Sequence, residues 1–129
     1  MRGERLSCQR QGDRDGRHTA RLGIGRRRCG ARVRITENGC SDPFNDGPAE
    51  DDFRIEYVRR HLQAVKSAME AGSDIGGYFH WTLADNWEWA EGYRSKFGLV
   101  AQDRTTGVRT PKQSYAWFSA LARSGTLDT

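Results

Sequence analysis

Glu37 is the first residue whose type and position could do chemistry. Val33, Ile35 and Glu37 alternate with polar residues, which predicts a short strand, and Asn38-Gly39 follows with turn chemistry. A carboxylate at the carboxyl end of a parallel strand is well placed to act as a nucleophile or general base. The same carboxylate would also suit a cap on the turn, so position alone leaves both interpretations open.

A second group of candidates lies in residues 81–89, where three tryptophans and two acidic residues fall within nine positions. The flat apolar face of a tryptophan, such as Trp81 or Trp89, suits the C–H face of a sugar ring. The carboxylate of Glu88 can accept hydrogen bonds from two hydroxyls at once. The alternative is an aromatic cluster that closes the core beneath a long loop, and the residues alone do not decide between binding and packing.

Hydrophobic periodicity predicts the elements that must position these candidates. After the strand near 33–37, a helix is expected to begin at Asp51 and Asp52, whose negative charge suits a helix N-terminus, and to stop near Gly72. Its expected apolar face consists of Phe53, Tyr57, Val58, His61, Leu62, Val65 and Met69. Residues 75–81 are typical of a second, largely buried strand, and the next thirty residues of a long aromatic-rich loop.

The last expected element is a helix opened by Thr110-Pro111, with proline at its first position, and ended by Gly125. Its inward side chains are expected to be Tyr115, Phe118, Leu121 and Ala122. The order strand, helix, strand, helix implies an α/β fold with two parallel strands joined by a crossover. Because parallel sheets occur almost only with both faces covered, such a unit looks like a piece of a larger α/β fold.

The distribution of charge divides the chain of 129 residues into two unlike pieces. Residues 1–34 contain eleven arginines, no lysine and three acids, a formal charge of +8, whereas residues 35–129 carry −4 and all 13 aromatic residues. A segment with this many charges and no aromatic residues cannot bury enough apolar surface to fold. Residues 1–31 are therefore predicted to be a disordered Arg/Gly-rich leader. A nucleic-acid-binding arm is the less favoured alternative, because nothing in it would stack on bases. An out-of-frame reading of GC-rich DNA is a third interpretation.

Composition also excludes several classes of protein and site. The mean hydropathy is −0.84 and no apolar run approaches the roughly 18 residues of a membrane span, so no membrane association is expected. No secretory signal core is present, and three cysteines without a C-x-x-C pair disfavour a disulfide framework, so a reduced, cytoplasmic setting is expected. His61 and His80 have no second ligand at metal-site spacing, so no metal or cofactor is expected.

Several segments at matching spacing resemble one enzyme family. Residues 35–39 (Ile-Thr-Glu-Asn-Gly) and 77–89 (Gly-Tyr-Phe-His-Trp-Thr-Leu-Ala-Asp-Asn-Trp-Glu-Trp) resemble two signature segments of glycoside hydrolase family 1, the β-glucosidase and β-galactosidase family. The similarity continues in family order through Tyr57 to Leu62, Gly92-Tyr93, Lys96-Phe97-Gly98-Leu99 and Arg109-Thr110-Pro111-Lys112. It covers about residues 35–125.

The resemblance implies a partial (β/α)8 TIM barrel, in which residues 32–129 form the C-terminal quarter: strand 7, helix 7, strand 8 and helix 8 only. It implies a retaining β-glycosidase that hydrolyses O-glycosyl bonds of β-glycosides or oligosaccharides, with Glu37 as the nucleophile. By the same resemblance, Trp81 would stack beneath the glycone, Glu88 and Trp89 would bind its hydroxyls, and Phe97 would help to wall the pocket. A non-proline cis peptide bond is expected between Trp81 and Thr82.

The departures from the family shape the remaining expectations. A retaining glycosidase needs a second carboxylate about 5–5.5 Å from the nucleophile, which the family carries in an Asn-Glu-Pro motif, and the sequence contains no such motif. We therefore expect the isolated chain to have negligible activity and the missing barrel strands to come from another chain. A non-catalytic sugar-binding or complementing fragment is the alternative. If Glu37 faces the barrel lumen, Val33 and Ile35 are expected to face it too, with Arg32 and Arg34 toward the helix layer.

Overall fold

The computed structural model describes residues 32–42 and 50–127. The expected leader, residues 1–31, therefore lies outside the described residues. The described elements are, in chain order, strand β1 (Val33–Asn38), helix α1 (Asp52–Glu70), strand β2 (Ile75–His80), the short helix η1 (Trp89–Glu91), strand β3 (Val100–Gln102), strand β4 (Arg109–Pro111) and helix α2 (Gln113–Ser124).

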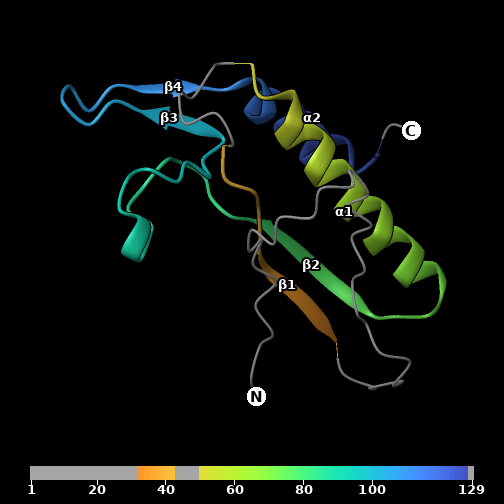
Figure 1. Cartoon of the computed structure of the whole chain (residues 1–129). Coiled ribbons are helices and arrows are strands. Elements are labelled where there is room, and N and C mark those ends of the chain that lie inside the picture. The colour runs from red at the N-terminus through yellow and green to blue at the C-terminus, as the bar shows by residue number, and fades with distance from the viewer. Residues whose placement is uncertain (1–31, 43–49, 128–129) are drawn as a thin grey trace, which may run out of the picture.

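The sheet is the parallel pair expected from the sequence, since α1 carries the chain from β1 back to the start of β2 (Figure 1). Both helices cover the same face of this sheet. Asn38 of β1 bonds to Tyr57 of α1, and Tyr78 and His80 of β2 contact the ring of Phe118 in α2. The structure thus contains two strand–helix units and, within the described residues, no closed barrel.

The core lies between β1 and α1. Ile35, Ile55, Val58 and Val65 are buried, and three of these four side chains share one face of α1 at three- and seven-residue spacing. Most of the predicted apolar face of this helix is buried or half-buried, but Met69 at its last turn is half exposed. None of the helices in the described part of the chain is long and apolar enough to cross a bilayer.

The expected orientation of β1 is wrong in one respect. The strand register shifts between Val33 and Ile35 and again between Ile35 and Asn38, so strict alternation does not hold along the strand. Ile35 is consequently buried beside Tyr78, on the helix-covered face. Arg34 is exposed and its Cγ lies near the Cβ position of Gly77, on the opposite, open face. The arginine side chain therefore avoids burial in the helix layer.

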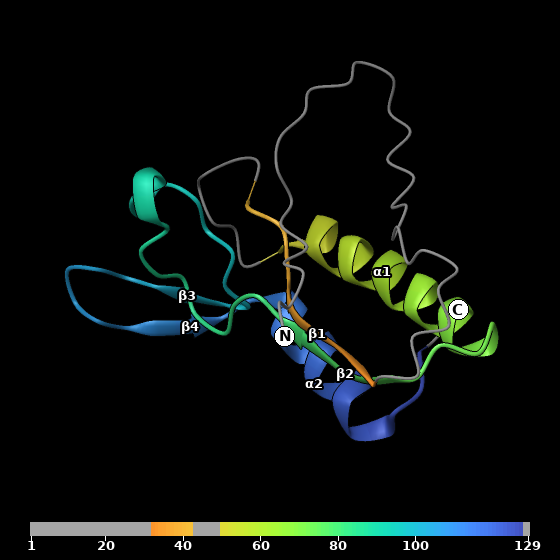
Figure 2. The ribbon, with the colours of Figure 1, turned by 90° about the horizontal axis from the view of Figure 1, so that it is seen from below.

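The expected long loop contains a β-hairpin. Strands β3 and β4 are antiparallel, and the turn between them is held by Asp103, whose carboxylate accepts hydrogen bonds from the amides of Thr105 and Thr106 at 2.8 and 3.0 Å. Main-chain bonds tie β3 to the segment after β2, including Val100 N–H to the carbonyl of Leu83 at 2.9 Å. The hairpin extends away from the β1–β2 sheet (Figures 1 and 2).

The start of the last helix also differs from the expectation. Pro111 is the final residue of β4 rather than the first residue of the helix, because Lys112 has an extended backbone and the helix begins at Gln113. Of the four side chains expected to face inward, Phe118 and Leu121 are half-buried, whereas Tyr115 and Ala122 are exposed. The helix does end at Gly125, which adopts the left-handed conformation typical of a helix C-terminus.

Candidate active site

The carboxyl end of β1 is fixed by a buried asparagine. Asn38 is almost fully buried, and its side-chain oxygen accepts a hydrogen bond from the hydroxyl of Tyr78 at 2.6 Å. Its amide nitrogen donates to the hydroxyl of Tyr57 in α1 at 3.4 Å. Because Asn38 is anchored to both β2 and α1, the position of its neighbour Glu37, a half-buried carboxylate at the strand end, is set by the sheet and helix together.

Trp81 and Glu88 form a hydrogen-bonded pair next to this strand end. The indole N–H of Trp81 donates to Oε1 of Glu88 at 3.0 Å, and the backbone N–H of Trp81 donates to the carbonyl of Asn38 at 2.9 Å. Burial raises the pKa of Glu88, and the nearby negative charge of Glu37 raises that pKa further, against the opposing effect of the Trp81 hydrogen bond. The structure thus brings Glu37, Trp81 and Glu88 into one polar site at the end of the sheet.

Glycine is required where the chain leaves β1. A Cβ on Gly39 would overlap the carbonyl oxygen of Trp81, so the backbones after β1 and β2 touch at this position. The sequence predicts a turn at Asn38-Gly39, whereas in the structure Gly39 allows this close approach. The expected cis peptide bond between Trp81 and Thr82 is present.

The side chains of the other two residues expected to contact the sugar, Trp89 and Phe97, are held by fewer contacts with the described residues. Trp89 lies at the start of η1 with a positive φ of 47°, and it is 82% exposed. Phe97 is half-buried, and its backbone carbonyl accepts hydrogen bonds from the amide of Thr82 at 3.4 Å and from the guanidinium of Arg54 at 3.1 Å. These contacts fix the backbone of Phe97 beside the site, while the sugar-binding roles of Trp89 and Phe97 stay predictions.

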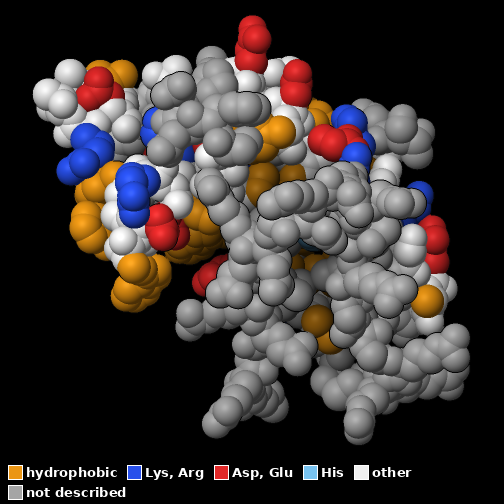
Figure 3. All heavy atoms as spheres, viewed as in Figure 1, with side chains coloured by type: hydrophobic (Ala, Val, Ile, Leu, Met, Phe, Trp, Pro, Cys, Tyr) orange, Lys and Arg blue, Asp and Glu red, His pale blue; other side chains and the backbone are white. Residues whose placement is uncertain are grey.

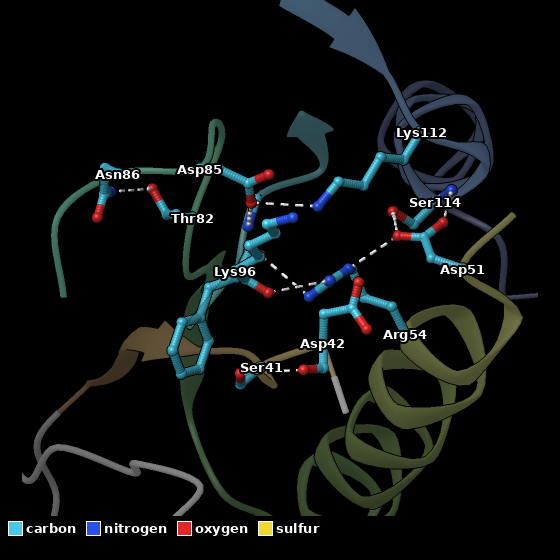
Figure 4. Close-up of polar contacts among 12 residues, drawn as sticks. Ser41, Asp42, Asp51, Arg54, Thr82, Asp85, Asn86, Lys96, Lys112 and Ser114 are labelled. Atoms are coloured by element: carbon cyan, nitrogen blue, oxygen red, sulfur yellow. Dashed lines mark hydrogen bonds and ion pairs between the residues drawn. The ribbon is translucent and has the colours of Figure 1, made fainter. Parts of the chain in front are cut away.

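A buried ionic network supports the loop from beneath. Arg54 is 0% exposed; its Nε donates to Asp51 at 2.8 Å, and its remaining nitrogens donate to the carbonyls of Cys40, Lys96 and Phe97 (Figure 4). Asp51 also accepts hydrogen bonds from the backbone amide and hydroxyl of Ser114, at 2.8 and 2.6 Å. One carboxylate therefore joins the start of α1 to the start of α2, where a negative charge is favourable.

A second buried ion pair joins the site loop to the segment before α2. Nζ of Lys112 donates to Oδ1 of Asp85 at 3.1 Å, and the same oxygen accepts the backbone amide of Gly98 at 2.8 Å (Figure 4). Sequence reasoning did not single out Arg54, Asp85 or Lys112 as functional. The only sequence signal for Arg54 was its three-residue spacing from Asp51, which places both on one side of a helical turn.

Two further features of the described residues bear on the site. A hollow is lined by Asp85, Asn86, Tyr93, Lys96, Gln102 and Arg104, and neither Glu37 nor Trp81 lines it. No group of three metal-ligating side chains occurs among the residues that the structure describes.

Comparison with known proteins places this geometry in context. The family model described as "Glycosyl hydrolase family 1" matches residues 24–126, a range that begins somewhat earlier than the resemblance expected from about residue 35. A β-glucosidase of Agrobacterium sp. is 48% identical over 90 residues, covering 68% of this chain and 20% of that protein. Beta-glucosidase 38 of Oryza sativa subsp. japonica is 44% identical over 93 residues, covering 70% of this chain and 19% of that protein.

The structural neighbours are consistent with these relatives. The family 1 β-glucosidase of Thermotoga maritima superposes with a TM-score of 0.71 at 37% identity, over 75% of this chain and 23% of that one. The same enzyme has been solved in complex with deoxynojirimycin. These neighbours are (β/α)8-barrel enzymes, and this chain spans less than a quarter of their length. A similar wheat β-D-glucosidase is described as chloroplastic, so a cytoplasmic location stays a prediction.

Proposed function

Because this chain belongs to glycosyl hydrolase family 1, we propose that it carries the nucleophile and part of the glycone pocket of a retaining β-glycosidase. The observation that carries the proposal is the position of Glu37 at the carboxyl end of β1, next to the hydrogen-bonded pair of Trp81 and Glu88. Catalytic residues of (β/α)8 barrels lie at this end of the strands.

In the proposed reaction, an oxygen of Glu37 attacks the anomeric carbon of a β-glycoside. A bond forms between that oxygen and the sugar, and the bond to the leaving oxygen breaks with its electron pair, which yields a glycosyl ester on Glu37. Water then cleaves the ester. A second carboxylate must protonate the leaving oxygen and later deprotonate the water, and the sequence holds no Asn-Glu-Pro motif to supply it.

The other site residues have binding roles in this proposal. The indole of Trp81 stacks beneath the sugar ring, and Glu88 accepts hydrogen bonds from two hydroxyls of the glycone. The bond from Trp81 to Glu88 orients both groups before a sugar binds. Trp89 and Phe97 would complete the far edge of the pocket. The names of the relatives favour a β-glucoside as the substrate class.

The proposal is tested by trapping the glycosyl ester. The dinitrophenyl β-glycoside of 2-deoxy-2-fluoroglucose carries a leaving group that departs without protonation, so the missing acid is not required for the first step. We expect slow addition of one fluoroglucosyl group per chain, located by peptide mass spectrometry on Glu37. The Glu37→Gln variant should not be labelled, whereas Glu91→Gln, which removes an exposed carboxylate nearby, should be labelled like the original chain.

Label on a residue other than Glu37, or no label at all, would contradict the proposal. Sugar binding without label would instead favour the alternative of a non-catalytic sugar-binding fragment.

A further inference from the structure

The loop that carries the proposed sugar-binding residues is held by polar contacts more than by burial of its own apolar side chains. Leu83, Trp87 and Trp89 are largely exposed. Hydrophobic side chains gather on the surface of the part of the molecule that carries η1 and the β3–β4 hairpin (Figure 3). Because these side chains bury little area, they contribute little to the position of the loop. The polar groups between Trp81 and Glu88 are therefore the ones that fix it.

Asp85 lies in the middle of this segment and makes three hydrogen bonds to the chain that follows the loop. Its Oδ1 accepts the backbone N–H of Gly98 at 2.8 Å and a proton of the Lys112 ammonium at 3.1 Å (Figure 4). Its own backbone N–H donates to the carbonyl of Val100 at 3.0 Å. One residue therefore ties the loop to the start of β3 and to the residue that precedes α2.

The ion pair between Asp85 and Lys112 is buried. The side chain of Lys112 is 1% exposed and that of Asp85 is 11% exposed. Burial and the nearby charge of Arg54 lower the pKa of Lys112, whereas the carboxylate of Asp85 raises it. Since an unpaired buried charge is strongly unfavourable, the loop cannot move away from the start of α2 without a large cost in free energy.

The backbone approaches Asp85 closely from the other side. A Cβ on Gly98 would overlap the backbone nitrogen and the carboxylate of Asp85, so only glycine fits at this position. Asp85 is thus held between the backbone of Gly98 and the ammonium of Lys112. Its place in the loop is fixed more firmly than that of the exposed tryptophans beside it.

We propose that Asp85 is a positioning residue of the sugar site, which holds the loop so that the indole of Trp81 and the carboxylate of Glu88 meet before a sugar binds. This inference rests on the proposed function and extends it to a residue that acts through these two neighbours. It accounts for the 3.0 Å hydrogen bond between them, which spans seven positions of a loop with an exposed surface. Groups oriented in advance lose less freedom on binding a ligand.

The proposal is tested by NMR of the full chain, which does not require activity. The indole N–H resonance of Trp81, assigned with Trp81→Phe, should follow the titration of Glu88, because the two groups are hydrogen-bonded. Asp85→Ala should remove this pH dependence and shift the resonance toward that of an indole exposed to water. Asp103→Ala is the matched control, since Asp103 also accepts two backbone amides but lies exposed in the hairpin turn. It should leave the resonance unchanged.

A second variant covers a failure of Asp85→Ala to fold. That change leaves the ammonium of Lys112 buried without its counter-ion, and the double variant Asp85→Ala with Lys112→Met removes the unpaired charge. Circular dichroism matched to that of the original chain verifies its fold, and it should show the same loss of pH dependence at Trp81. A role in stability alone would lower the midpoint of urea denaturation and leave the Trp81 resonance of the folded chain unchanged, which would overturn the inference.

Labelling of Glu37 by the fluoroglucoside separates this inference from the proposed function. We expect Asp85→Ala to be labelled more slowly than the original chain at low probe concentration, and equal rates would overturn the inference. Label on the original chain, with an unchanged Trp81 resonance in Asp85→Ala, would overturn the inference alone. No label on either chain, with the Trp81 resonance altered in Asp85→Ala, would contradict the proposed function and support the role of Asp85 in joining Trp81 to Glu88.

Discussion

At the scale of single residues, the carboxylates of Glu37 and Glu88 influence one another. Glu88 accepts a hydrogen bond from Trp81, which favours its charged form, but burial and the charge of Glu37 both disfavour that form. The net effect is a raised pKa for Glu88. In the proposed sugar site, Glu88 would therefore lose its charge, and with it part of its capacity to accept hydroxyl hydrogen bonds, at a higher pH than an ordinary glutamate.

Neutralising Glu37 should consequently lower the pKa of Glu88. In the Glu37→Gln variant the repulsion from the neighbouring carboxylate is absent, and the titration of Glu88, followed by carbon-13 NMR of its side-chain carboxyl group, should shift to lower pH. Glu91→Gln is the matched control and should leave that titration unchanged. An unchanged or raised midpoint in Glu37→Gln would show that the two carboxylates do not interact.

Arg54 is the residue on which the support of the site loop depends most. Its guanidinium is fully buried and satisfies the carboxylate of Asp51 and three backbone carbonyls. Replacing Arg54 by methionine would keep a long apolar stem but leave Asp51 buried without its counter-ion. Removing one member of a buried pair costs about 3–5 kcal/mol in free energy of unfolding.

We therefore expect urea denaturation to show a large loss of stability for Arg54→Met. Arg60→Met removes an ion pair to Glu56 that is shorter still, at 2.6 Å, but whose two side chains are about half exposed. Its loss should change the free energy of unfolding by roughly 0.5 kcal/mol or less. Similar losses in the two variants would contradict the structural role assigned to Arg54.

At the scale of elements, His80 links β2 to both the site loop and α2. Its Nε2 lies 3.3 Å from the carbonyl of Phe97, and because a carbonyl only accepts, this nitrogen must carry the proton of the neutral ring. The other ring nitrogen, Nδ1, is buried and has no hydrogen-bond partner among the residues that the structure describes. Burial is the main cause that lowers the pKa of His80 to about 4. The hydrogen bond to the carbonyl of Phe97 and the charge of Asp51 oppose this shift, whereas the charges of Arg54 and Lys112 add to it.

The stability of the fold should therefore decrease in mildly acidic solution. Between the ordinary histidine pKa of 6.5 and about 4, the unfolded chain binds a proton that the folded chain does not. The free energy of unfolding therefore decreases as the pH is lowered through this window. His80→Phe should flatten this part of a urea-denaturation pH series, whereas His61→Phe should retain it. A steep decline that persists in His80→Phe would assign the effect to another group.

The sequence predicted the elements better than the contacts between them. Periodicity and turn residues located both strands of the sheet and both helices, because a helix face or a strand leaves a local pattern. The register shift around Ile35 left no such pattern, so Ile35 was expected on the wrong face. The hairpin was missed because its strands are only three residues long.

In the site, too, the sequence predicted the residues that stand out within a short segment but not the contacts between distant segments. Glu37, Trp81 and Glu88 could be singled out because their types and spacing are unusual within short segments. Asp51 was interpreted only as a helix N-terminal charge, since its bonds to Ser114 join residues 63 positions apart. Contacts at that separation are decided by tertiary packing, which a single sequence does not reveal.

At the scale of the whole molecule, the described residues contain the proposed nucleophile, Glu37, but only two strand–helix units and no closed barrel. Glu37 is held by β1, and its neighbours come from the loop after β2, so both parts lie within the two strand–helix units. The acid that assists departure of the leaving group would have to come from a strand outside these units. In the proposed mechanism the two chemical steps would therefore separate. Ester formation with an activated substrate would need only the residues of this chain, whereas turnover would need a second carboxylate.

The isolated chain should accordingly show negligible steady-state hydrolysis of nitrophenyl β-glucoside. Loss of acid–base assistance alone lowers rates by about 10²–10⁴-fold. Release of nitrophenol, followed by absorbance, should be limited to about one equivalent per chain for the isolated protein. The Glu37→Gln variant should release none. Continuous release by the pure isolated chain that disappears in Glu37→Gln would mean that a carboxylate of this chain already acts as the acid. Glu88 would be the first candidate, because its raised pKa favours the protonated form that an acid requires.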